Sequence, residues 1–173
     1  LGEVTYFSPL ADTSLPDAGF VYLPGGYPEL YLAALSANRL MLQSIRRYVE
    51  NGGKLLAECG GMMYLCDEIR DKNGDVYPMA GVLHQSATME NMKLRLGYRT
   101  LLYNDARLKG HEFHYSRLVE QQDPLPSCAV AYTAKGVETD TPLYHYKNVW
   151  AGYTHLYWAD PAGNDWFTKF IIK

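Results

Sequence analysis

Apolar runs of strand length alternate with helical periodicity in the first 70 residues. Residues 19–23 and 54–58 are mainly apolar runs, typical of strands that are buried on both faces of a parallel sheet. Between them, apolar residues recur every three or four positions from 38 to 50, and a further helix is predicted over 62–69, soon after the second strand. This order of strands and helices predicts an open α/β sheet.

Residues that begin and end helices mark the boundaries of these segments. Pro28 and Glu29 suit the first turn of a helix that follows the first strand. Asn38 is a suitable N-cap for the longer helix, and Gly52 is a suitable residue to end it. We therefore expect two helices between the two parallel strands.

Beyond residue 71 the pattern changes to short apolar runs separated by polar turns. It favours antiparallel strands added to the parallel core. A short strand is also predicted at 3–7, and a last helix at 160–173, in which Trp166, Phe167 and Phe170 can share one face. The strands predicted in the second half are 81–83, 100–102, 129–132 and 148–153.

The composition is typical of one ordinary globular domain with a sizeable core. Of the 173 residues 47% are hydrophobic and 20% are charged, and the net charge of -3 offers no basic footprint for nucleic acid. No apolar run reaches the roughly 18 residues of a membrane span, and no signal peptide is recognisable. We expect a cytoplasmic protein without a membrane partner, and the start at Leu1 rather than Met suggests a piece of a longer chain.

Three cysteines, Cys59, Cys66 and Cys128, lack the paired spacing of a disulfide framework or a zinc site. Cys59 stands in the turn 57–61, where a nucleophile would project from the C-terminal edge of the sheet, and small neighbours such as Gly60 allow so tight a turn. The following helix is expected to lower the pKa of the thiol and to offer N–H groups to an oxyanion. The alternative is a buried, inert structural cysteine.

A second glycine-containing turn, 24–29, follows the first predicted strand. Gly25 and Gly26 would let the backbone approach a ligand closely and adopt positive φ angles. The sequence contains no Walker string, so this is not a phosphate-binding loop of that kind. A ligand-binding loop and a simple left-handed turn both agree with this pattern.

A cysteine nucleophile needs a base, and the chain offers five histidines. His155 follows the predicted strand 148–153 and would also lie at the end of a strand. His111 and His114 flank Glu112 in a string that is too polar for a core. Two histidines at this spacing are weak evidence for a metal site, because no third ligand is evident, and we expect none. The other two histidines are expected to be exposed or structural.

These motifs together resemble the C-terminal glutaminase domains of the cobyrinic acid a,c-diamide synthase family. The similarity extends over nearly the whole chain. Its Gly-Gly-Tyr-Pro-Glu and Gly-His-Glu-Phe-His strings are far more specific than a cysteine turn alone. The five strings that carry the resemblance are 6–10, 23–30, 57–65, 110–116 and 152–157.

The resemblance implies the α/β, flavodoxin-like fold of class I glutamine amidotransferases, in which helices flank a parallel core sheet with added antiparallel strands. The nucleophile of the family then falls on Cys59 and its histidine on His155. The oxyanion donors fall on the backbone of Gly60 and Gly26, with Gly25 in the same substrate-binding loop. Glutamine is the expected substrate, and residues 1–173 form one glutaminase domain.

The resemblance also implies partners outside this chain. Whole family members carry an N-terminal synthetase domain that uses ATP and Mg²⁺ to activate a corrin carboxylate, which captures the ammonia. No cofactor is expected in the present chain. The synthetase domain and the first strand and helix of the family precede residues 6–10, so both are expected to be missing here, and the fragment alone is not expected to make product.

Two positions depart from the general class I pattern. Ala57 stands where a glycine precedes the cysteine, and Tyr157 replaces the glutamate that orients the imidazole, as in the cobyrinate branch. The third role in the triad is therefore unassigned, with Glu58 and Glu112 as candidates. The residues expected to line the glutamine pocket or the synthetase interface are His111, Glu112 and His114.

Other interpretations remain open at the level of sequence. The acceptor could be another tetrapyrrole, as in hydrogenobyrinate a,c-diamide synthase or cobyric acid synthase. The domain could instead be a non-catalytic α/β binding module, or a cysteine hydrolase or chaperone on a similar sheet. The joint presence of Cys59, His155 and both glycine turns favours the amidotransferase.

Overall fold

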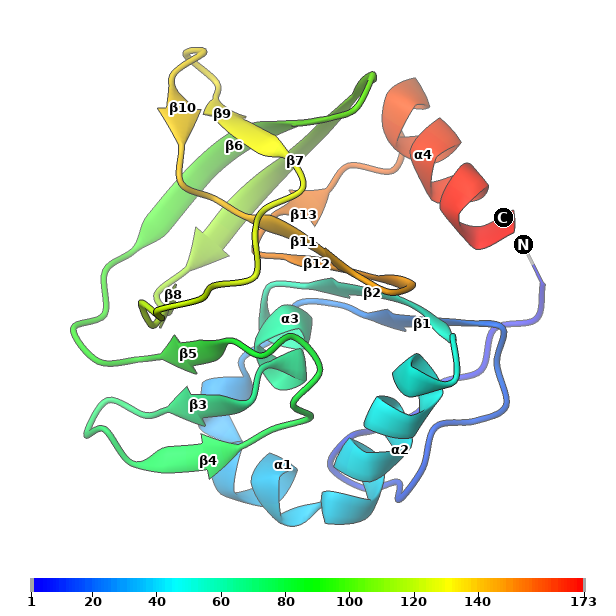
Figure 1. Cartoon of the computed structure of the whole chain (residues 1–173), viewed down its shortest axis with the longest axis vertical. Coiled ribbons are helices and arrows are strands. Elements are labelled where there is room, and N and C mark those ends of the chain that lie inside the picture. The colour runs from blue at the N-terminus through cyan, green and yellow to red at the C-terminus, as the bar shows by residue number, and fades with distance from the viewer. Residues whose placement is uncertain (1, 173) are drawn as a thin grey trace.

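The computed structural model describes residues 2–172, which contain a central sheet and two further sheets (Figure 1). The central sheet has the order β1-β2-β12-β11, with β1, β2 and β12 mutually parallel and β11 antiparallel at one edge. These strands confirm the predicted α/β class with a parallel core. Their bounds are Phe20–Leu23 for β1, Lys54–Glu58 for β2, Leu143–Tyr146 for β11 and Val149–Gly152 for β12.

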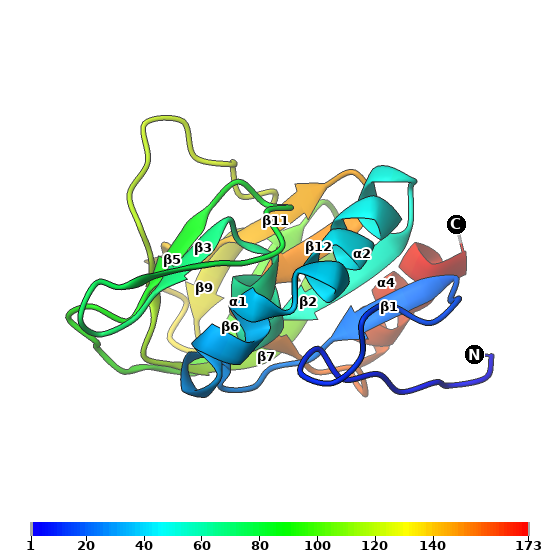
Figure 2. The same cartoon turned by 90° about the horizontal axis from the view of Figure 1, so that it is seen from below.

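Helices cover both faces of the central sheet. On one face, Leu55 and Val149 pack against α1, α2 and α3, while on the other Leu56 and Trp150 pack against α4 and the second sheet. In Figure 2, α1 and α2 lie in front of β2 and β12, and α4 lies behind the sheet. The helices are η1 (Pro28–Leu30), α1 (Leu32–Ala37), α2 (Arg39–Glu50), α3 (Gly60–Leu65) and α4 (Pro161–Ile172).

The expected helix boundaries between β1 and β2 are confirmed. Pro28 begins a 3-10 turn that leads into α1. The Oδ1 atom of Asn38 accepts a hydrogen bond of 3.3 Å from the N–H of Met41, which caps α2. Gly52 follows α2 with a φ of +86°, a left-handed conformation that favours glycine.

The antiparallel strands of the second half are also present, but most of them form separate sheets. Two strands of the second half join the core: β11 is antiparallel as expected, but β12, the strand predicted at 148–153, is parallel to β2, so an antiparallel arrangement is wrong for it. The second sheet contains β10 (Glu138–Thr139), β9 (Val130–Thr133), β6 (Arg95–Tyr103), β7 (Ala106–His114) and β13 (His155–Leu156), in that order. The third contains β4 (Val76–Pro78), β3 (Glu68–Arg70), β5 (Ser86–Thr88) and β8 (Arg117–Leu118).

Near the cysteine turn, the bounds of one predicted helix and the existence of one predicted strand are wrong. The helix predicted over 62–69 is α3, which begins earlier and ends at Leu65, and the chain then continues into β3. The strand predicted at 81–83 does not form. Its N–H groups donate instead to the carbonyls of Leu65 and Cys66, which have no partner within the short helix. Both corrections have one cause, because residues 81–83 bind the C-terminal end of α3 instead of forming a strand.

The strand predicted at 3–7 is wrong as well. These residues belong to none of the sheets of the described chain, and Tyr6 is 91% exposed. A run of apolar residues forms a strand only where a neighbouring strand can satisfy its backbone hydrogen bonds. Here the first paired strand is β1.

The predicted last helix is confirmed as α4. Its Trp166 ring lies 5.1 Å from that of Trp150, and its Phe167 ring lies 5.6 Å from that of Phe20. Phe170 is also predicted to lie on this face, but its side chain is not among those that the structure describes. Lys173, the last residue of the predicted helix, lies outside the described residues. None of the helices described over 2–172 is long and apolar enough to cross a membrane.

Candidate active site

Cys59 occupies a strained turn between β2 and α3. Its φ is +48°, a value that residues other than glycine rarely adopt. The N–H of Cys59 donates a hydrogen bond of 2.8 Å to the carbonyl of Gly152 at the end of β12. The turn is thereby held at the C-terminal edge of the parallel strands, where α/β proteins place their ligand sites.

The two glycines after Cys59 allow the chain that follows β1 to lie directly against this turn. A Cβ atom at Gly60 would lie 2.6 Å from the carbonyl oxygen of Gly26, and one at Gly61 would lie 2.3 Å from that of Leu23. Both distances are shorter than van der Waals contact allows. The two glycine turns of the sequence are therefore in contact in the folded protein.

Gly25 brings the same loop against His155. A Cβ atom at Gly25 would lie 2.2 Å from Cε1 of the imidazole. The prediction of positive φ angles at Gly25 and Gly26 is wrong, since neither is among the positive-φ residues. A glycine is needed at position 25 to make room for the histidine ring rather than to adopt a left-handed turn.

Strand β7 connects the histidine to the cysteine. His155 on β13 pairs with His111 on β7, and their rings stack with centroids 5.0 Å apart. Two residues further along β7, the carbonyl oxygen of Phe113 lies 4.0 Å from Sγ of Cys59. Because alternate residues of a strand are about 7 Å apart, Cys59 and His155 are brought to the same region from opposite ends of the chain.

The pKa of Cys59 contradicts the expectation from the helix. Burial, and to a smaller extent the carboxylates of Glu29, Glu112 and Glu58, raise the pKa of the thiol to about 11, although the Gly60 N–H acts to lower it. Helix α3 has only six residues, so the desolvation of a side chain that is 6% exposed outweighs the helix dipole. In the unliganded site Cys59 is therefore a neutral thiol.

His155 is suited to accept the proton of that thiol. Burial lowers the pKa of its imidazole, the charges of His111 and His114 lower it further, and Glu112 acts in the opposite direction. The ring is consequently neutral near pH 7, and a neutral imidazole has one nitrogen free to accept a proton.

Glu58, the last residue of β2, lies beside His155. It is one of the two glutamates that the sequence offers for the unassigned third role in the triad. Its Oε2 atom accepts a hydrogen bond of 2.7 Å from the Tyr22 hydroxyl and lies 3.8 Å from Nδ1 of His155. Its Oε1 atom accepts a hydrogen bond of 3.0 Å from the N–H of Leu156. Burial raises the pKa of Glu58, and these two hydrogen bonds only partly oppose that rise.

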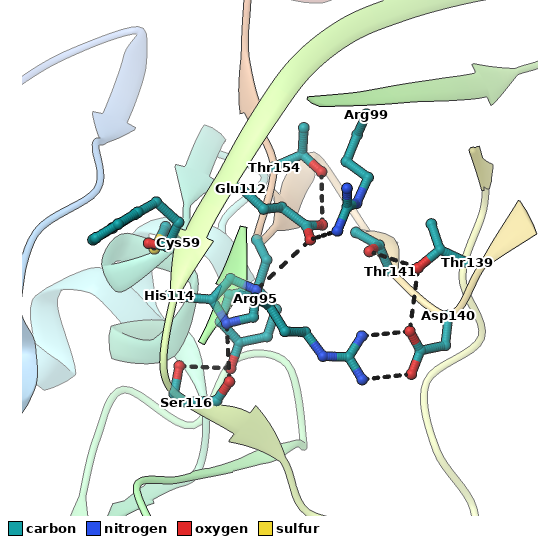
Figure 3. A network of polar contacts seen from close by, with 12 residues as sticks. Cys59, Arg95, Arg99, Glu112, His114, Ser116, Thr139, Asp140, Thr141 and Thr154 are labelled. Atoms are coloured by element: carbon teal, nitrogen blue, oxygen red, sulfur yellow. Dashed lines mark hydrogen bonds and ion pairs between the residues drawn. The ribbon is translucent and has the colours of Figure 1, made fainter. Parts of the chain in front are cut away.

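The three residues of the Gly-His-Glu-Phe-His string do not lie together. Alternation along β7 exposes His111 and Phe113, whereas Glu112 and His114 are buried on the opposite face. Figure 3 shows Glu112 and His114 pointing into a group of polar side chains that includes Arg99 and Thr154. Of the three, His111 stacks on the ring of His155. Glu112 and His114 instead belong to what we call the inter-sheet network, which comprises Arg99, Glu112, His114, Thr141 and Thr154.

Glu112 is the central carboxylate of the inter-sheet network. It is fully buried, and its Oε2 atom lies 2.8 Å from a guanidinium nitrogen of Arg99 and 3.9 Å from Nε2 of His114. Thr154 donates a hydrogen bond of 3.4 Å to its Oε1 atom. Burial alone would raise the pKa of Glu112, but His114, Thr141 and Arg99 together outweigh burial and lower it. This carboxylate is therefore ionised and paired.

The other histidines and cysteines lie elsewhere. His84 is exposed beside Asp67, and the His145 ring stacks on Trp150 with centroids 3.9 Å apart. Cys66 is fully buried and Cys128 is partly buried. Over residues 2–172, no three His, Cys, Asp or Glu side chains are grouped as a metal site requires.

Comparison with known proteins agrees with this geometry. Residues 2–163 match the family model of the CobB/CobQ-like glutamine amidotransferase domain. The chain is 38% identical over 160 residues to hydrogenobyrinate a,c-diamide synthase of Pseudomonas aeruginosa, covering 90% of this chain and 35% of that protein. It is 40% identical over 160 residues to cobyrinate a,c-diamide synthase of Fusobacterium nucleatum, with the same coverage. The chain thus spans about a third of the length of these relatives.

A solved structure shows a similar fold. The crystal structure of a glutamine amidotransferase aligns with 90% of this chain and 80% of its own, with a TM-score of 0.58 and 17% sequence identity. At that identity the likeness supports the flavodoxin-like amidotransferase fold expected from the sequence. The match over residues 2–163 shows the family itself, and the chain belongs to the CobB/CobQ-like glutamine amidotransferase domain family.

Proposed function

We propose that this chain hydrolyses the side-chain amide of glutamine, with Cys59 as the nucleophile and His155 as its base. One observation carries the proposal, namely that a single glycine loop contacts both the turn of Cys59 and the ring of His155. A nucleophile and a base from distant parts of the chain, held together at the edge of a sheet, are the minimum for cysteine-based acyl transfer.

In the first step the thiol proton passes to His155 and the sulfur attacks the amide carbon of glutamine. Because the pKa of Cys59 is raised, the proton leaves as the attack occurs rather than beforehand. The developing oxyanion is bound by the N–H groups of Gly60 and Gly26. The Gly60 N–H opposes the rise in the pKa of Cys59, so it lies close to the sulfur, which supports the first assignment. Loss of one such donor typically costs about 2.7–4 kcal/mol of barrier.

The tetrahedral intermediate then collapses. The carbon–nitrogen bond breaks, and ammonia leaves with the proton that His155 carried. Water, deprotonated by the same imidazole, attacks the thioester and releases glutamate and the Cys59 thiol. The sum is glutamine plus water giving glutamate plus ammonia, and it requires no cofactor within the chain.

We further propose that the ammonia is consumed by an ATP-dependent synthetase domain of the same polypeptide. The relatives are named for a,c-diamide synthesis on cobyrinate and on hydrogenobyrinate, and two thirds of their length lies outside the region matched here. The acceptor would be a corrin ring with a and c carboxylates, and ATP and Mg²⁺ would bind in that domain. The cytoplasm suits this chemistry, since it keeps the Cys59 thiol reduced.

Exposed apolar side chains beside the site support the proposal that a second domain contacts this one. On the outer face of the second sheet, Leu96 pairs with Phe113 and Tyr98 pairs with His111, which itself stacks on His155. Leu96 is 62% exposed and Tyr98 is 75% exposed. Such a patch is typical of a surface that contacts another domain.

The test is to replace Cys59 with serine in the whole polypeptide that the gene encodes. Glutamine-dependent amidation and glutamate release should fall to background, whereas amidation supported by free ammonia should persist. Cys128→Ser is the matched control, because Cys128 lies away from the site, and it should retain both activities. Full glutamine use by Cys59→Ser would refute the proposal.

Covalent labelling provides a second readout. An electrophilic glutamine analogue should modify Cys59 selectively, and glutamine should protect it, while fully buried Cys66 remains unmodified. Mass spectrometry locates the label. Equal labelling of all cysteines, without protection, would mean that Cys59 is only a reactive thiol and would favour a non-catalytic binding module.

A further inference from the structure

We propose that Glu58 is the positioning residue that orients His155 and stabilises its protonated form during glutamine hydrolysis. This inference rests on the proposed function of the site. Glu58 immediately precedes the nucleophile, yet its carboxylate lies beside the base, so one turn of chain presents both groups. Tyr157, two residues after His155, offers no carboxylate and is 59% exposed.

Both oxygens of Glu58 are held in place from neighbouring strands. Tyr22 on β1 donates to Oε2, and the N–H of Leu156 on β13 donates to Oε1. Leu156 follows His155 directly, so the second bond also ties the backbone of the histidine to the end of β2. The Glu58 side chain is only 4% exposed, and a carboxylate buried with two hydrogen bonds has little freedom to turn away.

The ring of His155 presents Nδ1 to this carboxylate. The distance from Nδ1 to Oε2 is 3.8 Å, which is about 1 Å longer than a hydrogen bond. The contact with Gly25 and the stacking on His111 constrain the plane of the ring. Catalytic hydrogen bonds are often long before substrate binds and shorten afterwards, so a small rotation closes this one.

This arrangement assigns the roles of the two ring nitrogens. When Nδ1–H donates to Glu58, the other nitrogen, Nε2, remains free to take the proton of Cys59. His155 then becomes positively charged beside a carboxylate. The proton stays on the histidine, and Glu58 contributes by orienting the ring and by its charge.

The electrostatics of the resting site agree with this role. Burial raises the pKa of Glu58, and the hydrogen bonds from Tyr22 and Leu156 oppose it only in part. Protonation of His155 places a positive charge 3.8 Å from this carboxylate, so the attraction is stronger in the transition state than in the ground state. The titratable groups around His155 are Glu58 from β2, Cys59 from the turn, and His111, Glu112 and His114 from β7.

Glu112, the other candidate, is unsuited to this role. It lies on the face of β7 opposite to His111, and its carboxylate is already paired with Arg99. Its charge raises the pKa of His155, which shows that it acts over a distance, but no contact between the two side chains is present among the described residues. Glu58 approaches His155 directly.

The experiment measures glutamine hydrolysis by Glu58→Gln in the whole polypeptide. The amide keeps an oxygen that can accept from Leu156 but loses the charge. We expect kcat to fall by about 10²-fold or more, with KM for glutamine near the wild-type value. The acidic limb of the kcat profile should move to lower pH, because His155⁺ loses its anionic neighbour. A purely structural role would not produce this shift.

Two further variants keep the test decisive. Glu58→Asp retains the charge on a shorter side chain and should be less impaired than Glu58→Gln. If Glu58→Gln does not fold, Glu58→Asp decides: because its carboxylate lies farther from Nδ1, a reduced kcat at unchanged KM with the acidic limb at lower pH supports the inference, and a kcat and pH profile both equal to the wild type overturn it. Glu50→Gln removes an exposed carboxylate paired with Lys147 and should leave the kinetics unchanged.

Failure of this inference is distinguishable from failure of the proposed function. If Cys59→Ser is inactive but Glu58→Gln has the kcat and pH profile of the wild type, only the role of Glu58 is overturned. If Cys59→Ser hydrolyses glutamine normally, the proposed function fails, and the role of Glu58 fails with it.

Discussion

Two buried glutamates on either side of the candidate site differ in almost every respect except burial. Glu58 lies at the C-terminal end of β2, where its carboxylate accepts hydrogen bonds from Tyr22 and Leu156, and its pKa is raised. Glu112 lies in the inter-sheet network, 2.8 Å from Arg99, and its pKa is lowered. Burial pushes both pKa values upward, so the partners decide the outcome.

The comparison separates a group that supports folding from one that supports chemistry. An ionised, paired carboxylate such as Glu112 joins two layers of the fold and has little left to offer a reaction. A buried carboxylate with a raised pKa, such as Glu58, gains most when a positive charge forms beside it. We therefore expect changes near Glu112 to lower stability and changes near Glu58 to lower activity.

The largest effect is expected for Arg99→Met. This change leaves the Glu112 charge buried without its guanidinium partner, which should cost about 3–5 kcal/mol of unfolding free energy. Urea unfolding measures it, with Arg107→Met on the exposed face of β7 as the control. A loss below about 1 kcal/mol, as for an exposed ion pair, would contradict the distinction between the two glutamates.

Next in size is the effect of Gly25→Ala on activity. The new methyl group would overlap the His155 ring, whose Cε1 is 2.2 Å from its position, so the imidazole must move. A displacement of about 1 Å typically costs about 10²-fold in rate. Glutamine hydrolysis should fall by that factor while the unfolding free energy stays near the wild-type value. Gly19→Ala, which has open space around it, is the control.

If Gly25→Ala instead lowered stability with activity intact, the loop would be a structural turn and its contact with His155 incidental.

The smallest effect concerns the pH dependence of stability, and the two glutamates should differ in sign. Because the folded pKa of Glu112 is lowered, its stabilisation is present above the unfolded pKa and is lost as pH falls through the folded pKa. Glu112→Gln should therefore be about 1–3 kcal/mol less stable than the wild type at pH 7, and the difference should shrink in acid.

Because the folded pKa of Glu58 is raised, its ionisation lowers stability as pH rises through that value. Glu58→Gln should be at least as stable as the wild type at pH 7, with the difference fading below the unfolded pKa. Thermal unfolding across pH 4–8 measures both variants. A loss of stability at pH 7 for Glu58→Gln would contradict this assignment of signs.

Much of the architecture was predictable because it depends on neighbouring residues. The runs at 19–23 and 54–58 are strands, Asn38 caps its helix, and the second half contains antiparallel strands. The prediction failed at 3–7 and 81–83, where apolar residues lack a neighbouring strand or serve the end of α3. Pairing depends on distant chain, which a local pattern does not describe.

The candidate site was predictable in its members more than in its electrostatics. Cys59, His155 and the glycine turns were identified by short strings, and the structure brings them together. The grouping of His111 with Glu112 and His114 is wrong, because side chains alternate between the two faces of a strand. The sequence carries this period-two signal in the string 110–116.

The sequence by itself determined strands β1 and β2, the helix boundaries between them, the cysteine turn and the family resemblance, since each depends on residues within a few positions of one another. Only the tertiary structure decided the raised pKa of Cys59, the separate roles of Glu58 and Glu112, and the contact of Gly25 with His155. Those properties depend on burial and on contacts between distant segments, such as the bond between Glu58 and Leu156 across 98 positions.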